Sequence, residues 1–404
     1  MTGDRSWATP LRAAILRPAA VARAHRAGGG RVVGVLGWSA PRELVTAAGL
    51  LPVRLSPRRL DGSPPEPGGM PEPGDRSGSH GNGIGTGSGS GIAAGLGREL
   101  PPEMAAIARA LLTGGLEWVD AVLIGRDSEA HTKLFYLLRE LRRGGAAPGL
   151  PPVAFYDLLR LPSRTSARYN RLRARELTDT AARWAGRPVT SDDLERAVHD
   201  AAATAGRLAE LTALRTAPRP AVAGSDALTA ALAAQVLPGE QLRAHLAAAS
   251  PGNPSGPPPA ARVFLAGSGL DDPAAYEALE DLGIALVGED HEWGDDGAAP
   301  PARTADPLDG IVDRYHFGHG GVARDGLRDR AERTAGKIAA AAADGVVYLT
   351  GEHDEAAGWQ LPALAERLGP GTPLIPVRLA GEAADGRPAL REAALRLLEE
   401  VRRA

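Results

Sequence analysis

Cysteine is absent from this sequence of 404 residues, and other reactive or bulky residue types are scarce. A chain without cysteine forms no disulfide, binds no metal through thiolates and has no cysteine nucleophile. Lys133 and Lys337 are the only lysines, so nearly all of the positive charge is carried by arginine. Aromatic residues make up only 4% of the chain, and we therefore expect its cores to consist mainly of Ala, Leu and Val.

Long apolar runs and a strong charge bias are missing as well. No stretch of about 18 apolar residues occurs, so we expect no membrane span. The first 30 residues contain Arg and Ala but no apolar segment followed by a cleavage site, which indicates a cytoplasmic chain with a helical N-terminal arm. The formal net charge of -3 argues against a nucleic-acid partner, since such proteins normally present a basic face.

The pattern that is present alternates short apolar runs with helical segments. Residues 31–36 read as a strand, Pro41 opens a short helix that ends at Gly49, and a second strand follows. Strand–helix–strand units of this kind predict parallel strands with right-handed crossovers. Because the pattern returns after residue 262, we predict an α/β protein with two doubly wound, Rossmann- or flavodoxin-like domains and an additional helical segment.

Changes in composition predict where these parts begin and end. Residues 61–98 are rich in Pro, Gly and Ser and are expected to be a disordered insertion, because they cannot bury enough apolar surface to offset their ordering entropy. Ser191 is expected to cap a long helix. The predicted parts are an N-terminal arm (1–30), a first α/β domain (31–162), a helical segment (163–248), a linker (249–261) and a second α/β domain (262–404).

Several polar loops follow predicted strands, which is where doubly wound sheets bind ligands. The turn at 267–269 places Ser268 before a helix, where backbone amides could hold a phosphate, although a plain tight turn explains it as well. His316 and His319 are three residues apart, a spacing that one metal ion could bridge but that is not specific. The candidate catalytic residues in the loops are Asp127, His131, Glu352, His353 and Asp354.

Residues 32–55, "VVGVLGWSAPRELVTAAGLLPVRL", resemble the N-terminal signature of the 2-hydroxyacyl-CoA dehydratase family, which includes benzoyl-CoA reductase subunits. The positions that fit the family pattern are Pro41, Glu43, Ala47, Gly49, Pro52 and Arg54. Later segments fit by order and spacing, so that the resemblance covers most of the chain outside 61–98.

The resemblance implies a lyase or reductase that acts on acyl-CoA thioesters. In that family two homologous subunits hold [4Fe–4S] clusters through cysteines, and an ATP-dependent activator supplies an electron for radical removal of water. The family's cysteines correspond here to Gly37, to positions near Ala105 and Asp127, and to His353. With no cysteine in the chain, a cysteine-bound cluster is expected to be absent.

Three functions remain open from the sequence. In the first, the chain is a cluster-free enzyme whose cleft uses His–Asp acid–base chemistry, or a mononuclear metal held by His291, Glu292 and His353. In the second, it is a non-catalytic subunit that pairs with a cysteine-bearing homologue as a dimer. In the third, it is a binding protein. The residues expected to contact the ligand are Gly37, Trp38, Ser39, Glu43 and Ser268.

Overall fold

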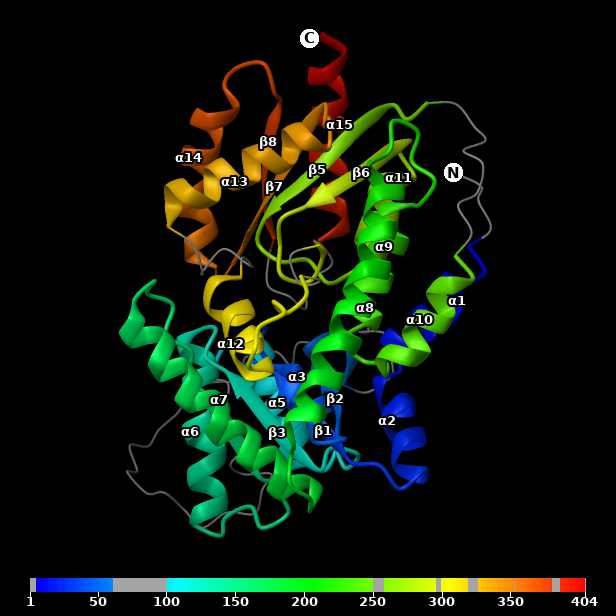
Figure 1. Cartoon of the computed structure of the whole chain (residues 1–404). Helices are drawn as coiled ribbons and strands as arrows, with labels where there is room; N and C mark the ends of the chain where they lie inside the picture. Colours follow the sequence, from blue (N-terminus) through cyan, green and yellow to red (C-terminus); the bar gives the residue numbers. More distant parts are fainter. Residues whose placement is uncertain are drawn as a thin grey trace, which may run out of the picture.

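The computed structural model describes residues 5–60, 100–249, 258–295, 299–318, 326–352, 354–379 and 386–403. It contains two four-stranded parallel sheets with helices on both faces, one above the other in Figure 1. The predicted α/β class with two doubly wound sheets is therefore confirmed. The predicted insertion at 61–98 and most of the predicted linker lie outside the described residues.

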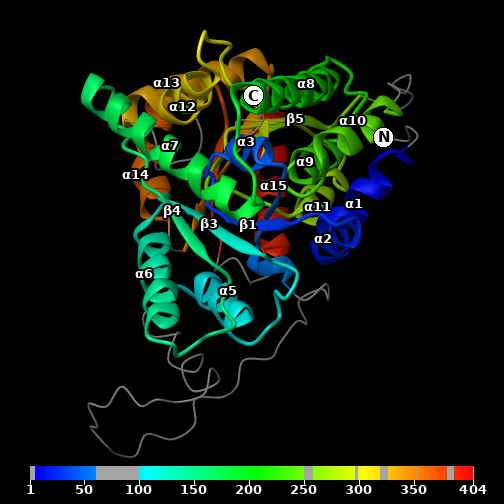
Figure 2. The ribbon, with the colours of Figure 1, turned by 60° about the horizontal axis from the view of Figure 1, so that its bottom comes forward.

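The first sheet is built around the strand that follows the N-terminal arm. Its order is β2 (Leu51–Arg54), β1 (Val32–Leu36), β3 (Ala121–Gly125) and β4 (Val153–Tyr156). Side chains alternate between the two faces: Val33 and Val35 pack toward α3 (Arg42–Ala47), whereas Val32 and Leu36 belong to the opposite core. α5 (Pro102–Leu112) and α6 (Glu129–Arg143) cover that opposite face (Figure 2).

The second sheet repeats this plan. Its order is β6 (Ile284–Glu289), β5 (Ala261–Gly267), β7 (Gly345–Gly351) and β8 (Leu374–Leu379). α13 (Leu327–Ala340) and α14 (Glu355–Leu368) cover one face. α9 (Gly224–Ala233), α11 (Pro273–Glu280) and α15 (Arg387–Arg403) cover the other. In both sheets the first strand lies between the second and the third, so a switch point falls between β1 and β3 and another between β5 and β7.

The helical segment joins the two sheets. It comprises α7 (Arg164–Ala185), α8 (Ser191–Thr216), α9 and α10 (Gly239–Ala247). α8 contacts α3 near the first sheet and β6 in the second, and it runs past both in Figure 1. Thr190, not Ser191, caps α8, because Thr190 and Asp193 form a reciprocal capping box.

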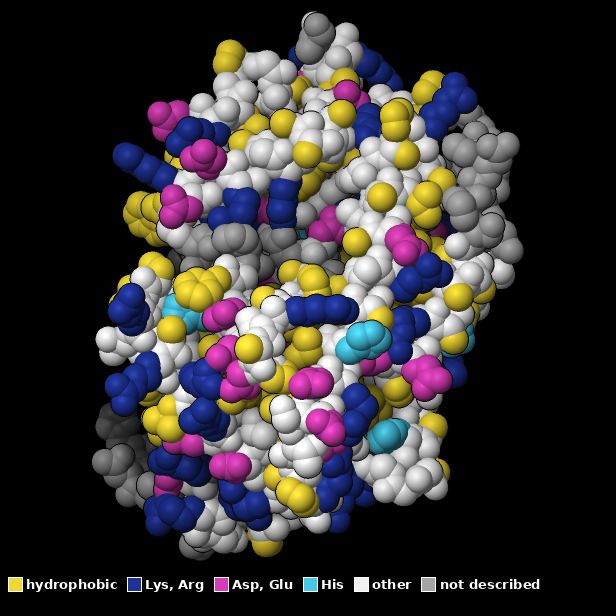
Figure 3. All heavy atoms as spheres, in the orientation of Figure 1, with side chains coloured by type: hydrophobic (Ala, Val, Ile, Leu, Met, Phe, Trp, Pro, Cys, Tyr) yellow, Lys and Arg dark blue, Asp and Glu magenta, His cyan; other side chains and the backbone are white. Residues whose placement is uncertain are grey.

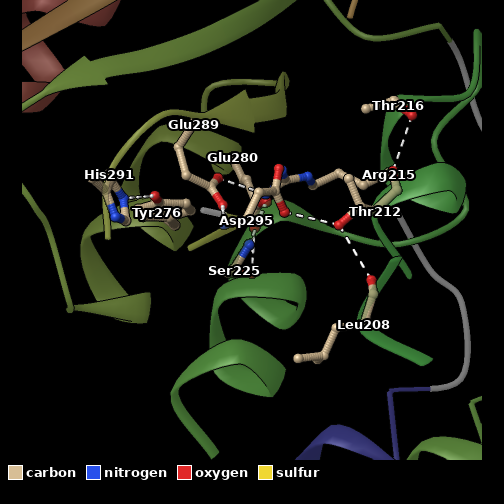
Figure 4. Close-up of polar contacts among 10 residues, drawn as sticks. All are labelled: Leu208, Thr212, Arg215, Thr216, Ser225, Tyr276, Glu280, Glu289, His291 and Asp295. Atoms are coloured by element: carbon tan, nitrogen blue, oxygen red, sulfur yellow. Dashed lines mark hydrogen bonds and ion pairs between the residues drawn. The ribbon is translucent and has the colours of Figure 1, made fainter. Parts of the chain in front are cut away.

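A buried ion-pair network anchors α8 to the second sheet (Figure 4). Arg215 near the end of α8 is 1% exposed, and its guanidinium lies 2.6 Å from the Glu289 carboxylate at the end of β6. The same guanidinium contacts Asp295, which also accepts a hydrogen bond from Thr212. Because both acids share one buried cation, the network fixes the loop that leaves β6.

Two other elements connect distant parts of the chain. The N-terminal arm forms α1 (Ala8–Leu16) and α2 (Pro18–Ala27), and α1 packs against α9 through buried Leu11 and Ile15. α12 (Pro307–Phe317) follows β6 in sequence but packs on α7 and α8, beside the first sheet.

No helix in the described ranges is long and apolar enough to cross a lipid bilayer. On the face shown in Figure 3, Lys and Arg side chains are interspersed with Asp and Glu.

Candidate functional site

The first switch point brings Asp127 against the turn that follows β1. The Asp127 carboxylate accepts hydrogen bonds from the backbone N–H groups of Trp38 and Ser39, the latter at 3.1 and 3.2 Å to its two oxygens. Arg160 donates to Asp127 Oδ1 at 3.0 Å. These amides form a small anion-binding nest, and the chain's own aspartate fills it.

Gly37 makes this arrangement possible. Its φ of +84° lies in the left-handed region that favours glycine, and a Cβ at this position would overlap Asp127 Oδ2. Position 37 is therefore closed to any side chain while Asp127 occupies its place.

At the second switch point an aspartate again contacts the turn after the first strand, but here the donor is a serine hydroxyl and not a backbone N–H. Ser268 follows β5, and its Oγ donates to Asp354 Oδ2 at 2.8 Å. The backbone N–H of Gly351, at the end of β7, donates to the same Oγ at 2.8 Å. Asp354 also caps α14, accepting from the N–H of Ala357. In each sheet an aspartate that follows the third strand thus holds the turn after the first strand.

The charges of both aspartates, Asp127 and Asp354, act on the carboxyl group of Glu292. Burial raises the pKa of Glu292 to about 7, against a lowering by a backbone hydrogen bond and by the charge of Arg330; the charges of Asp354 and Asp127 add smaller upward contributions. A carboxyl group with this pKa is half protonated near neutrality, which is the property of a general acid–base group.

A cavity of about 210 Å³ opens beside Glu292 at the carboxyl end of the second sheet. Ser268, Glu352 and Asp354 line it from the second sheet, and Arg58 and Glu103 line it from the first. Trp293 forms part of the wall. The cavity is therefore an interdomain space at a switch point, where doubly wound sheets bind their ligands.

An arginine cluster holds the wall of this cavity against the first sheet. The Arg54 guanidinium lies 3.3 Å from the Trp293 ring centroid and 2.9 Å from Asp271. Ser56 donates to Asp271 at 3.1 Å. Burial opposes ionisation of Asp271, but the charges of Arg54, Arg59 and Arg58 outweigh it and keep the pKa of Asp271 below its ordinary value.

The predicted histidines do not share one environment. His131 Nδ1 lies 2.9 Å from Ser128 Oγ, and burial lowers the pKa of His131 while nearby Asp127 raises it. His291 is 1% exposed, and its Nε2 lies 2.8 Å from the Tyr276 hydroxyl, inside the second domain (Figure 4). His353 lies outside the described residues.

The ligands available for a mononuclear metal and those available for an iron–sulfur cluster differ in this structure. Within the described ranges, no group of three or more His, Asp or Glu side chains is arranged to hold a metal ion. The set of His291, Glu292 and His353 stays a prediction, because one of its members lies outside those ranges. A [4Fe–4S] cluster does not fit this chain, since the switch points present Asp127 and Asp354 and the sequence has no thiolate.

The residues expected to bind the ligand lie in three different places. Trp38 and Ser39 lie at the first switch point, where the Trp38 ring is 5.6 Å from that of Tyr315, and Ser268 lines the cavity. Glu43 is 4% exposed and is held by Arg314 and by the Tyr315 hydroxyl at 2.8 Å, away from the 210 Å³ cavity. Three arginines also contribute to these sites: Arg58, Arg160 and Arg330. They could not be identified from the sequence, because their positions are scattered along the chain and form no motif.

Two parallel-sheet domains, each with an aspartate at its switch point, define a two-domain α/β protein with an interdomain cavity beside the second switch point. Within this class, the chain belongs to the family described as 2-hydroxyglutaryl-CoA dehydratase, D-component, whose model matches residues 37–392. No individual curated protein matches the chain at a significant level. The resemblance found in the sequence is thus confirmed at the level of the family.

Proposed function

We propose that this chain is a cluster-free member of the dehydratase family that performs proton transfer on a small carbonyl compound in the interdomain cavity. The observation that carries the proposal is the pKa of about 7 for Glu292, which is raised in part by Asp127 and Asp354. A perturbed carboxyl group that borders a cavity at a switch point is typical of an active site.

The chemistry follows from the groups available. As a carboxylate, Glu292 removes the proton next to a thioester carbonyl, and the electron pair of the broken C–H bond moves onto the carbonyl oxygen. The protonated Glu292 then returns a proton to carbon, or protonates a hydroxyl on the next carbon so that it leaves as water. Only a proton acidified by the carbonyl is removed in this way, so radical dehydration of a 2-hydroxyacyl group lies outside the proposal.

The size of the cavity supports a small reacting group. About 210 Å³ is less than the roughly 300–1,000 Å³ of typical pockets for drug-sized ligands, so the cavity suits a short acyl group and not a whole coenzyme. Arg58 in its wall lies 3.6 Å from Asp271, and most other charged groups of the wall are acidic, so the anionic part of the substrate is expected to stay outside. An acyl-CoA thioester with its carrier outside the cavity meets both conditions.

The test is exchange of the carbon-bound proton with deuterated water, followed by NMR on short acyl thioesters. We expect exchange by the chain alone, and a rate at least about 100-fold lower for Glu292→Gln. Glu366→Gln, which removes an exposed carboxylate of α14, is the matched control and is expected to leave the rate unchanged.

A supporting subunit is the second candidate, and the closed position at Gly37 favours it. The family name refers to one component of a dehydratase, which supports a homologous partner subunit; that this partner bears the cysteines and works with an ATP-dependent activator is implied by the family resemblance. If the chain alone exchanges no proton in any thioester, but activity appears when such a partner is added and is insensitive to Glu292→Gln, the second candidate replaces the first.

A further inference from the structure

A buried polar cluster joins the loop that follows β6 to helix α13. It consists of Asp290, Arg330 and Thr334, and each of these residues is almost fully buried. Arg330 Nη2 lies 3.1 Å from Asp290 Oδ2, and Thr334 donates a hydrogen bond to the same oxygen. All three residues lie outside the wall of the cavity beside Glu292, so their polar groups serve to hold other parts of the protein.

Both backbone polar groups of Gly267, the last residue of β5, are bound by this cluster. The N–H of Gly267 donates to Asp290 Oδ1 at 3.1 Å, and Arg330 Nη2 donates to the Gly267 carbonyl oxygen at 3.4 Å. Arg330 Nη2 also donates to the backbone carbonyl of Asp290 at 3.2 Å. Gly267 has a φ of +98°, a conformation that favours glycine. The turn that carries Ser268 therefore starts from a backbone that Asp290 and Arg330 fix.

The same cluster fixes both sides of the contact between Glu292 and that turn. Glu292 follows Asp290 by two residues, and a Cβ on Gly269 would lie 2.8 Å from Glu292 Oε1. The carboxyl group of Glu292 thus packs against the backbone of the turn. The charge of Arg330 also lowers the pKa of Glu292. Arg330 therefore acts on Glu292 both through the backbone and through its charge.

We propose that Arg330 is a positioning residue for proton transfer by Glu292. Through Asp290 it holds the turn against which the Glu292 carboxyl group packs, and its charge favours the carboxylate form that accepts the proton. Arg330 lies outside the cavity wall, so it acts through Glu292 and does not contact the substrate. The inference rests on the proposed function, but the effect of Arg330 on the ionisation of Glu292 is measurable without any substrate.

The first test follows the ionisation of Glu292 by carbon-13 NMR in two variants that change the buried pair in opposite ways. Arg330→Met removes the cation, so the pKa of Glu292 should rise by at least about 0.5 pH unit. Asp290→Asn removes the carboxylate that balances Arg330, so the pKa of Glu292 should fall. Loss of packing alone does not produce opposite changes. Arg328→Met, which removes an exposed arginine of the same helix, is the matched control and should titrate like the wild type.

The second test is exchange of the carbon-bound proton of short acyl thioesters with deuterated water, with each protein measured on the plateau of its own pH profile. Arg330→Met should be slower than the wild type by about tenfold or more, because the carboxyl group is no longer held in place. Arg330→Lys keeps the charge, so it should leave the ionisation of Glu292 close to that of the wild type and recover part of the rate.

The outcomes separate this inference from the proposed function. If the wild type exchanges no proton, the proposed function is refuted, and the titrations alone then decide whether Arg330 controls the ionisation of Glu292. The inference is overturned if Arg330→Met titrates and exchanges like the wild type, or if both variants of the pair change the pKa of Glu292 in the same direction. If Arg330→Met does not fold, an unchanged pKa of Glu292 in Asp290→Asn overturns it.

Discussion

Gly37 and Asp127 fit each other so closely that the first switch point depends on both. Asp127 fills the nest formed by the amides of Trp38 and Ser39, and Gly37 leaves room for its carboxylate. A side chain at position 37 would therefore have to displace Asp127, because the carboxylate of Asp127 takes the space that a Cβ would need.

The first prediction at this scale concerns Gly37→Cys. We expect a loss of unfolding free energy of about 2–4 kcal/mol, because the new side chain is strained at positive φ and displaces Asp127. Gly114→Cys is the matched control: Gly114 has a φ of +81°, but no atom lies within 4 Å of the position that a Cβ would take there. Urea denaturation should show a loss for Gly37→Cys that is about 1–3 kcal/mol larger; equal losses would show that Asp127 does not hold that space.

The second prediction at this scale concerns Arg215, the cation that Glu289 and Asp295 share in the buried ion-pair network. Arg215→Ala leaves the carboxylates of Glu289 and Asp295 without their cation, and we expect a loss of about 3–5 kcal/mol. Arg207→Ala, on the same helix, removes the exposed pair with Glu210 and should change stability by less than about 1 kcal/mol. Thermal unfolding distinguishes them, and similar melting temperatures would contradict the role given to Arg215.

At the scale of elements, α1 acts as part of the core of the second domain and not as a loose arm. Leu11 is fully buried against that core, whereas Leu16, on the same helix, is 54% exposed. Leu11→Ala is expected to cost about 2–5 kcal/mol through the cavity it leaves, and Leu16→Ala less than about 1 kcal/mol. Chemical denaturation of both variants checks this; a Leu11 variant as stable as the wild type would separate α1 from the core.

The strands could be predicted from the sequence because fully buried parallel strands read as short apolar runs. "RVVGVL" and "GVVYLT" both became central strands with the expected polar residues after them. The polar residues of the two switch points could also be found in the sequence, since each follows a strand: Asp127, Ser268, Glu292 and Asp354. What sequence could not supply is tertiary placement: α12 packs on α7 although it follows β6, and His291 turns inward to Tyr276 although its loop is polar.

At the scale of the whole molecule, the cavity exists because Arg58 and Glu103 of the first domain face the switch point of the second. Arg54, stacked on Trp293 and paired with Asp271, ties the first sheet to the loop that carries Glu292. The electrostatic environment of Glu292 depends on an aspartate from each domain. Its protonation is thus a property of the assembled pair of domains.

This arrangement makes stability depend on pH. The pKa of Glu292 is about 7 in the folded chain, against an ordinary value of 4.5, so between these values the folded state holds a proton that the unfolded state has released. The free energy of unfolding therefore falls as pH rises through this window, by up to about 3 kcal/mol. Glu292→Gln lacks this loss. Between pH 5 and pH 8 its free energy of unfolding, measured by urea denaturation, should therefore fall less than that of the wild type. An identical pH dependence for the two proteins would contradict the prediction.

The most direct measurement is a carbon-13 NMR titration of the full chain labelled at the glutamate carboxyl carbons, with Glu292→Gln as the reference that identifies the resonance. We predict one glutamate with a pKa near 7 that is missing from the variant and shifts downward when Asp354 is replaced by Asn. A Glu292 resonance that titrates near 4.5 would contradict the account of a shared, cluster-free acid–base site between the two domains.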